Sequence, residues 1–403
     1  MILAAGSTDT AIAFVEVGAV VFGLGLLSRL AGRIGVTAVP LYLIAGLAFG
    51  DGGIAELDVT EDFVSLAAEI GVLLLLFTLG LEYSDEELRT GLRTGISPGL
   101  VDMTLNAGAG FALGMLLGWT PLAAVLLGGV SWVSSSGVIS KVLNDLGRLG
   151  NRETPPVLNL LVIEDLAMAI YLPVVAALIV GGTFTETLTS VSVALAVVAA
   201  ILVIALRYGR TLSRGLGSGS NESVLLGIFG LVLLVAGAAQ FFEVSGAIGA
   251  FLVGLALSGR AEERALELMS PLRDLFAATF FVSFSFQINP SDLLDVAGWA
   301  MLLAVVTALT KTATGWHAAR RRGIGRKGRL RAGTVLIARG EFSIVIAALG
   351  ADLADGPELG AIAAGYVLVT AVLGPLTTRF SDQISDLRAK RRPSTHRKTH
   401  PAH

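Results

Sequence analysis

The chain contains no cysteine, and only 15% of its residues are charged. The absence of cysteine excludes disulfide bonds and thiolate metal sites. The four histidines have no spacing that suits a metal site, because one stands alone and the others lie in the C-terminal tail. The N-terminus lacks a basic region followed by a cleavage site, so we expect no removable signal peptide. Hydrophobic residues make up 54% of the whole chain, which indicates a membrane protein.

Apolar runs of about 20 residues recur along the whole chain, and each is long enough to cross a bilayer as a helix. Helices are the expected structure because lipid offers no hydrogen bonds to the backbone. The sequence therefore predicts an all-α polytopic membrane protein with a transmembrane domain over residues 1–379. The thirteen predicted spans are residues 10–30, 36–50, 63–81, 95–118, 120–142, 154–181, 187–207, 221–242, 245–259, 271–287, 294–316, 332–350 and 359–379.

Basic residues occur in alternate connections between these spans, from Arg29 to the cluster Arg320–Arg331. The opposite connections contain acidic residues and no Lys or Arg. Because basic loops stay in the cytoplasm, this pattern places the N-terminus outside and the C-terminus in the cytoplasm. Residues 380–403 are predicted to form a short, basic, disordered cytoplasmic tail with no soluble domain attached.

The most informative feature is the pair Glu164 and Asp165, which lies in the middle of the apolar stretch Leu158–Val180. A carboxylate at this depth costs roughly 2.5–3.5 kcal/mol, and ion-coupled transporters use such groups to bind protons and cations. Lys311 lies at a matching depth in its own span. Since adjacent helical residues point about 100° apart, we expect one acid to pair with Lys311 while the other faces a water-filled cavity. A fixed salt bridge is the alternative.

Two predicted spans are interrupted by polar residues, at Ser131–Gly137 and at Ala338–Ser343. Paired interrupted helices in the two halves of a chain indicate a transporter site built from inverted repeats. Their exposed helix ends can bind a cation, and Arg339 and Glu341 would neutralise those ends or each other. A structural ion pair and ordinary hydrogen bonding between helices are the alternatives. The supporting site residues predicted from the breaks are Ser134, Ser135, Ser136, Arg339, Glu341 and Ser343.

Other polar residues within the spans carry less information. Asn159 and Asn106 are candidate neutral ligands. Glu16 and Asp102 are isolated in their spans, and we assign neither a role.

Five stretches then occur in an order that resembles the Kef-like monovalent cation:proton antiporters, and most closely the Kht-type K⁺/H⁺ antiporters. The resemblance runs from about residue 14 to residue 379, and Ser285 replaces a glycine that is common in the family. The five stretches are GVLLLLFTLGLEYS (71–84), SWVSSSGVISKVL (131–143), LLVIEDLAMAIYLP (160–173), FFVSFSFQINPSDL (280–293) and ARGEFSIVIA (338–347).

The resemblance implies an NhaA-like antiporter fold with two crossing discontinuous helices. Core helices at about 95–181 and 294–379 would move against scaffold helices at about 10–81 and 221–287, joined by a linker helix at 187–207. It also implies a homodimer in the cell inner (plasma) membrane, with a separate cytoplasmic regulatory subunit of the potassium-transport regulator type. No nucleic acid, cofactor or enzymatic activity is expected.

By the same resemblance, Asp165 would bind the proton or the transported K⁺ or Na⁺, and Lys311 would face the pair of acids at 164 and 165. Glu164 occupies the preceding position, and the Glu-Asp pair leaves open whether one or two carboxylates titrate. The sequence thus predicts K⁺/H⁺ exchange by alternating access, with Na⁺/H⁺ exchange as the alternative. A cation channel would need a repeated filter or a ring of charges, and a membrane-embedded hydrolase would place its two acids on different helices. Neither pattern is found.

Overall fold

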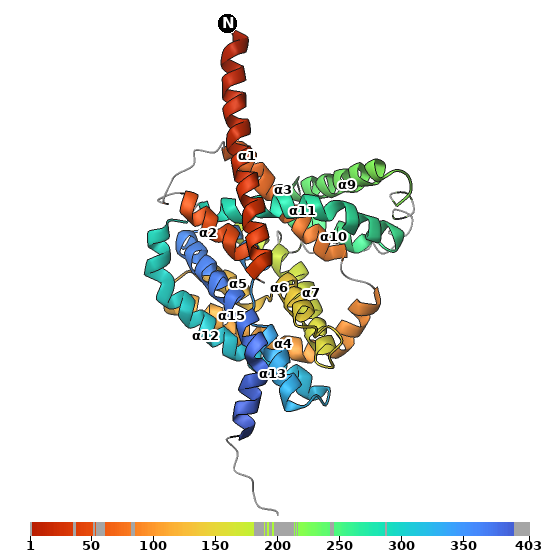
Figure 1. The fold of residues 1–403 in the computed structure, drawn as a ribbon, viewed down its shortest axis with the longest axis vertical. Coiled ribbons are helices and arrows are strands. Elements are labelled where there is room, and N and C mark those ends of the chain that lie inside the picture. Colours follow the sequence, from red (N-terminus) through yellow and green to blue (C-terminus); the bar gives the residue numbers. More distant parts are fainter. Residues whose placement is uncertain are drawn as a thin grey trace, which may run out of the picture.

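The computed structural model describes residues 2–34, 38–50, 53, 61–81, 85–180, 217–241, 246–286 and 288–390, with isolated residues between 189 and 215. All regular structure in these ranges is helical, which confirms the predicted all-α class (Figure 1). The predicted linker helix lies almost wholly outside them. The helices are α1 (Ile2–Ile34), α2 (Val39–Phe49), α3 (Glu61–Leu81), α4 (Asp85–Leu116), α5 (Pro121–Trp132), α6 (Ser136–Asp145), α7 (Thr154–Val180), α9 (Asn221–Phe241), α10 (Gly246–Ala256), α11 (Arg260–Phe286), α12 (Pro290–Arg321), α13 (Arg326–Val335), α14 (Glu341–Leu349) and α15 (Gly356–Lys390).

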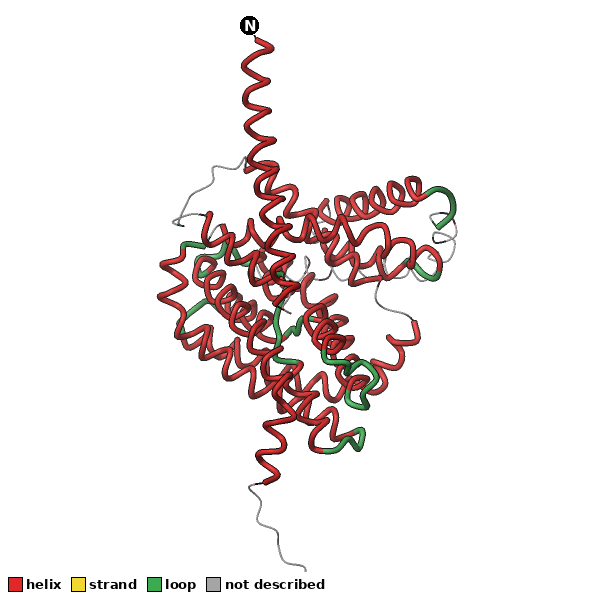
Figure 2. The backbone as a smooth tube through the Cα atoms, in the orientation of Figure 1, coloured by secondary structure: helices red, strands yellow, loops and turns green. Residues whose placement is uncertain are grey.

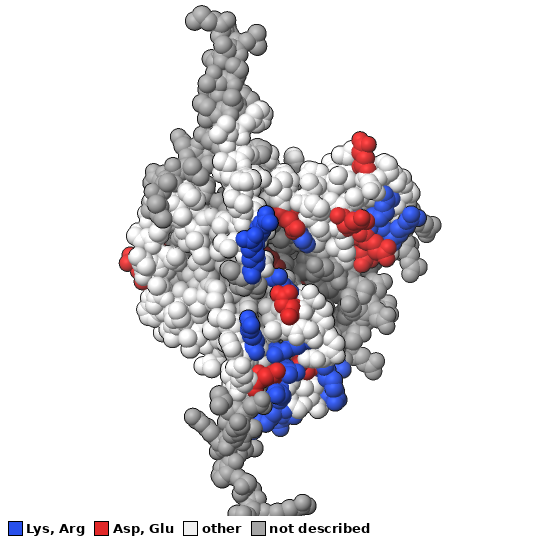
Figure 3. Space-filling model, in the orientation of Figure 1, with Lys and Arg blue, Asp and Glu red and all other residues white. Residues whose placement is uncertain are grey.

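The described part of the chain contains six stretches that are long and apolar enough to cross a membrane. Several helices are longer than the predicted spans, because a helix can continue past the point where its apolar run ends. The face in Figure 3 is mainly uncharged, and much of its Lys and Arg gathers at the end where α13 lies. These features are those of a multi-pass membrane protein.

The helices pack in two groups. The α3 group consists of α1, α2, α3, α9, α10 and α11, and the α12 group consists of α4, α5, α6, α7, α12, α13, α14 and α15. Figure 1 shows α3, α9, α10 and α11 in the upper part and α4, α7, α12 and α13 below them. Within the α3 group, α3 and α10 approach so closely that a Cβ atom on Gly254 would collide with the carbonyl oxygen of Phe77. Only glycine allows this contact between backbones.

The two predicted breaks are present and meet each other. α5 ends at Trp132 and α6 begins at Ser136, while α13 ends at Val335 and α14 begins at Glu341. The amide N–H of Ser135 donates a hydrogen bond of 3.0 Å to the carbonyl oxygen of Ala338, which joins the two extended segments. Figure 2 shows loop segments within the helical body. The prediction of two crossing discontinuous helices is confirmed.

The predicted disordered tail needs correction, because α15 continues as helix through residues 380–390. Its extension is held by two arginines. Arg331 donates two hydrogen bonds of 2.7 Å to the carboxylate of Asp382, and Arg148 lies 3.4 Å from the same carboxylate. Composition alone does not reveal these tertiary contacts. Residues 391–403 lie outside the described residues.

Candidate ion-binding site

Glu164 and Asp165 lie on α7, where this helix passes the crossing of the two broken helices. Their exposed fractions are 0% and 2%, so both acids are enclosed by protein. Their side chains leave the helix about 100° apart and therefore have different surroundings. Glu164 accepts hydrogen bonds from the backbone N–H of Ser134 (2.6 Å) and from its hydroxyl (3.2 Å). The first break thus contacts this carboxylate directly.

Lys311 on α12 bridges two buried carboxylates. Its Nζ lies 2.9 Å from Oε1 of Glu164 and 2.8 Å from Oδ2 of Asp102 on α4. The structure therefore brings Lys311 together with Glu164, which is the pairing suggested by their equal depth. All three side chains are almost completely buried. Removing one charged partner of such a cluster would leave an uncompensated charge in a low-dielectric interior.

Asp102 is the residue that our sequence analysis missed. Besides Lys311, it accepts hydrogen bonds from Nε1 of Trp132 (3.0 Å) and from Nδ2 of Asn106 (2.9 Å). A signal was present in the sequence. Asp102 comes seven residues after the predicted start of its span at residue 95, a depth similar to that of Lys311. Asn106, which we considered as a ligand, instead orients Asp102.

Arg339 binds the C-terminal ends of two half-helices. Its guanidinium is fully buried and donates hydrogen bonds of 2.9 Å to the carbonyl oxygens of Ser131 and Leu336. These carbonyls lie at the ends of α5 and α13, where the helix dipole is negative. The hydroxyl of Tyr366 also donates a hydrogen bond of 3.4 Å to the carbonyl oxygen of Ser131.

Glu341 lies at the N-terminal ends of the other two half-helices, α6 and α14. It is the first residue of α14, and its Oε2 accepts a hydrogen bond of 3.0 Å from the hydroxyl of Ser135, which caps α6. A negative charge is favourable at these N-terminal ends. Nearby, Ser343 donates to the carbonyl oxygen of Val130 at 2.8 Å. Arg339 and Glu341 thus each complement a pair of helix ends.

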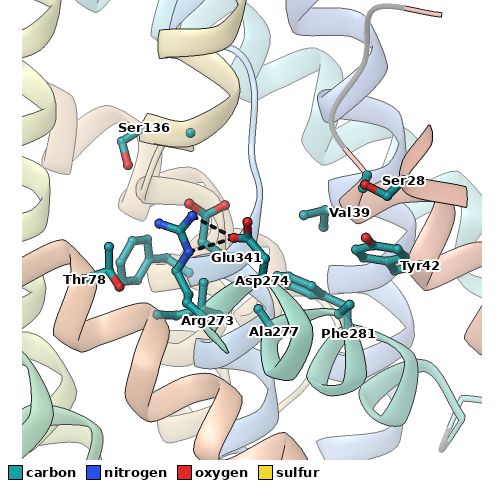
Figure 4. A pocket seen from close by; sticks show the side chains of 15 residues that line it. Ser28, Val39, Tyr42, Thr78, Ser136, Arg273, Asp274, Ala277, Phe281 and Glu341 are labelled. Atoms are coloured by element: carbon teal, nitrogen blue, oxygen red, sulfur yellow. Dashed lines mark hydrogen bonds and ion pairs between the residues drawn. The ribbon is translucent and has the colours of Figure 1, made fainter. Parts of the chain in front are cut away.

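A cavity of about 310 Å³ lies between the two helix groups. Ser136 and Glu341 line it from the α12 group, while Tyr42, Arg273 and Asp274 belong to the α3 group. Figure 4 shows the Arg273–Asp274 pair and the carboxylate of Glu341 lying close together within it. The ion pair within α11 measures 2.7 Å.

Asn159 lines another cavity, together with Gly95, Pro98 and Arg321. That cavity contains none of the other predicted site residues. Within the described ranges no three His, Cys, Asp or Glu side chains cluster in a way that could hold a metal ion.

A family model described as "Sodium/hydrogen exchanger, transmembrane" matches residues 18–381. The chain belongs to this family. Its membership confirms the predicted resemblance to cation:proton antiporters.

Two relatives are similar to this exchanger over almost their entire length. The K(+)/H(+) antiporter subunit KhtU of Bacillus subtilis (strain 168) is 33% identical over 378 residues, covering 92% of this chain and 93% of the relative. The Na(+)/H(+)-K(+) antiporter GerN of Bacillus cereus is 26% identical over 369 residues, covering 91% and 93%.

Among solved structures, the sodium proton antiporter MjNhaP1 from Methanocaldococcus jannaschii is similar, with a TM-score of 0.67. At 15% sequence identity the alignment covers 94% of this exchanger and 98% of that chain. The similarity confirms the antiporter fold.

Proposed function

We propose that this protein is a secondary antiporter that exchanges cytoplasmic K⁺ for external H⁺ by alternating access. Family membership supports cation:proton exchange, and the relative named as a K(+)/H(+) antiporter subunit supports K⁺. Na⁺ is the alternative cation, because GerN is named for both ions. We propose no enzymatic activity and no cofactor.

The observation that carries this proposal is the placement of two adjacent buried acids beside the crossing of two broken helices. Asp165 would hold either a proton or a cation, and this competition couples the two fluxes. Glu164 would adjust that competition through its contact with Lys311. Serine hydroxyls and backbone carbonyls at the breaks would supply neutral oxygen ligands, as in other transporters with interrupted helices.

Movement of the α12 group against the α3 group would expose Asp165 to one side at a time. In this proposal the α12 group is the core and the α3 group is the scaffold, and the cavity lined by both supports a route toward the breaks. We place the N-terminus outside and the C-terminus in the cytoplasm of the cell inner membrane, from the distribution of Lys and Arg. The scaffold helices would form a homodimer. A separate cytoplasmic regulatory subunit is supported by the word "subunit" in the name of KhtU.

The test is proton flux in reconstituted liposomes, read with a pH-sensitive dye after addition of K⁺, Na⁺ or Li⁺. We expect a K⁺-evoked signal in the wild type and a signal no larger than that of protein-free liposomes for Asp165→Asn. Asp295→Asn changes an exposed acid on α12 and serves as the matched control. Exchange retained by Asp165→Asn would refute the site assignment.

Further outcomes separate the alternatives. A response to Na⁺ alone would identify a Na⁺/H⁺ antiporter. Conductive cation flux that needs no proton gradient would indicate a channel. If no cation evokes a signal, co-reconstitution with a cytoplasmic regulator distinguishes a missing activator from a wrong function.

A further inference from the structure

The carboxylate of Asp102 is held by N–H donors from three directions. Lys311 on α12 and Trp132 on α5 donate to Oδ2, while Asn106, one turn along α4, donates to Oδ1. Asn106 is itself held, because its Oδ1 accepts a hydrogen bond of 2.7 Å from the hydroxyl of Thr310. A carboxylate that accepts several N–H bonds is stabilised in its ionised form. This arrangement fixes the Asp102 carboxylate between α4, α5 and α12, and its contact with the first break is through the indole N–H of Trp132, the last residue of α5.

Glu164, the other partner of Lys311, is held differently. Apart from Lys311, its donors are the backbone N–H and the hydroxyl of Ser134, which lies in the first break. Glu164 is also adjacent in sequence to Asp165, the proposed binding residue. Any ligand or proton that arrives at Ser134 would therefore compete with Lys311 for Glu164, while Asp102 would keep its own side-chain donors, Trp132 and Asn106.

The buried ammonium of Lys311 needs a second anion as counterion. If Lys311 had Glu164 as its only partner, then protonation of Glu164 or cation binding to it would leave a buried ammonium without a counterion, which is costly. Arg339 is the other buried cation whose charge acts on Asp102, but its donors are occupied by carbonyls of the half-helix ends. Asp102 lies within 2.8 Å of Lys311 and supplies the missing counterion.

We propose that Asp102 is a positioning residue that keeps Lys311 in place and charge-balanced while Glu164 exchanges its partner during the transport cycle. The inference rests on the proposed antiport function. During the transport cycle the ion pair between Lys311 and Asp102 stays formed, and the ion pair between Lys311 and Glu164 is the one that breaks. The pair of acids at Glu164 and Asp165 can then change its occupant without an unpaired charge in the membrane.

The first test is the pH dependence of exchange in the variant Asp102→Asn, which keeps the shape of the side chain and removes its charge. Lys311 would then act on Glu164 alone, and the loss of a nearby anion would favour the ionised acids at positions 164 and 165. We expect the pH of half-maximal exchange to fall by about one unit and the KM for K⁺ to rise roughly tenfold. Thr370→Val, which removes a buried hydroxyl that donates to backbone carbonyls of α15 itself, is the control and should leave both values unchanged.

The second test does not depend on transport. Thermal unfolding is measured for Asp102→Asn, Lys311→Gln and the double variant. Because the double variant leaves no charge of this pair without its partner, its loss of stability should be smaller than the sum of the two single losses.

Each outcome decides the inference. Additive losses in the cycle would overturn it, as would a folded Asp102→Asn protein with unchanged pH dependence and KM. If Asp102→Asn does not fold, recovery of folded protein in the double variant supports the pairing, and failure to recover it assigns Asp102 to packing alone. If the wild type exchanges no cation, the proposed function fails while the unfolding cycle still decides whether Asp102 holds Lys311.

Discussion

Arg339 is expected to be the residue whose loss most weakens the crossing of the broken helices. Its two shortest hydrogen bonds, each 2.9 Å, satisfy Ser131 at the end of α5 and Leu336 at the end of α13. A hydrogen bond from a charged donor contributes about 1.5–3 kcal/mol. Replacing Arg339 with methionine removes both and should therefore destabilise the protein by about 3–6 kcal/mol.

Chemical or thermal unfolding of the purified protein measures this loss. Arg339→Lys keeps the charge but not the planar fork that reaches both carbonyls, so its stability should fall between those of the wild type and Arg339→Met. Arg320→Met is the matched control, because Arg320 is exposed at the end of α12. The reasoning is refuted if Arg339→Met is as stable as Arg320→Met, since the carbonyl ends would then not depend on the guanidinium.

Two further predictions concern the site and the packing around it. Glu164→Gln removes a charge bound to Lys311 and should retain some exchange with a changed pH profile in the liposome assay; an unchanged profile would make Glu164 structural. Gly254→Ala should lower the free energy of unfolding by about 1–3 kcal/mol, because the added methyl group forces α10 away from α3. Gly298→Ala, on a helix with open space around this position, should have little effect, and equal losses in the two variants would contradict the packing argument.

The fold could be predicted to a large extent because lipid imposes strong constraints on the chain. Long apolar runs have to be helices there, and polar, glycine-containing interruptions at Ser131–Gly137 and Ala338–Ser343 conflict so clearly with this rule that they mark the broken helices. The end of the last helix was less predictable. Residues 380–390 have no apolar run, and their helix is held by side chains from elsewhere in the chain, among them Arg331.

The candidate site was predictable only in part. A charged residue in an apolar span is conspicuous, which identified Glu164, Asp165 and Lys311. Asp102 is equally buried, yet it could not be ranked above other isolated acids without knowledge of which helices are neighbours.

The sequence by itself determined the class of the protein, its helical character, the two breaks and the presence of costly buried charges. These follow from hydropathy and local backbone preferences, which act over one or two helical turns. The tertiary structure decided which charges meet: Lys311 with both Glu164 and Asp102, and Arg339 with two carbonyl ends. Such pairings join residues as much as 209 positions apart, and they depend on helix rotation and neighbour choice, which no local pattern specifies.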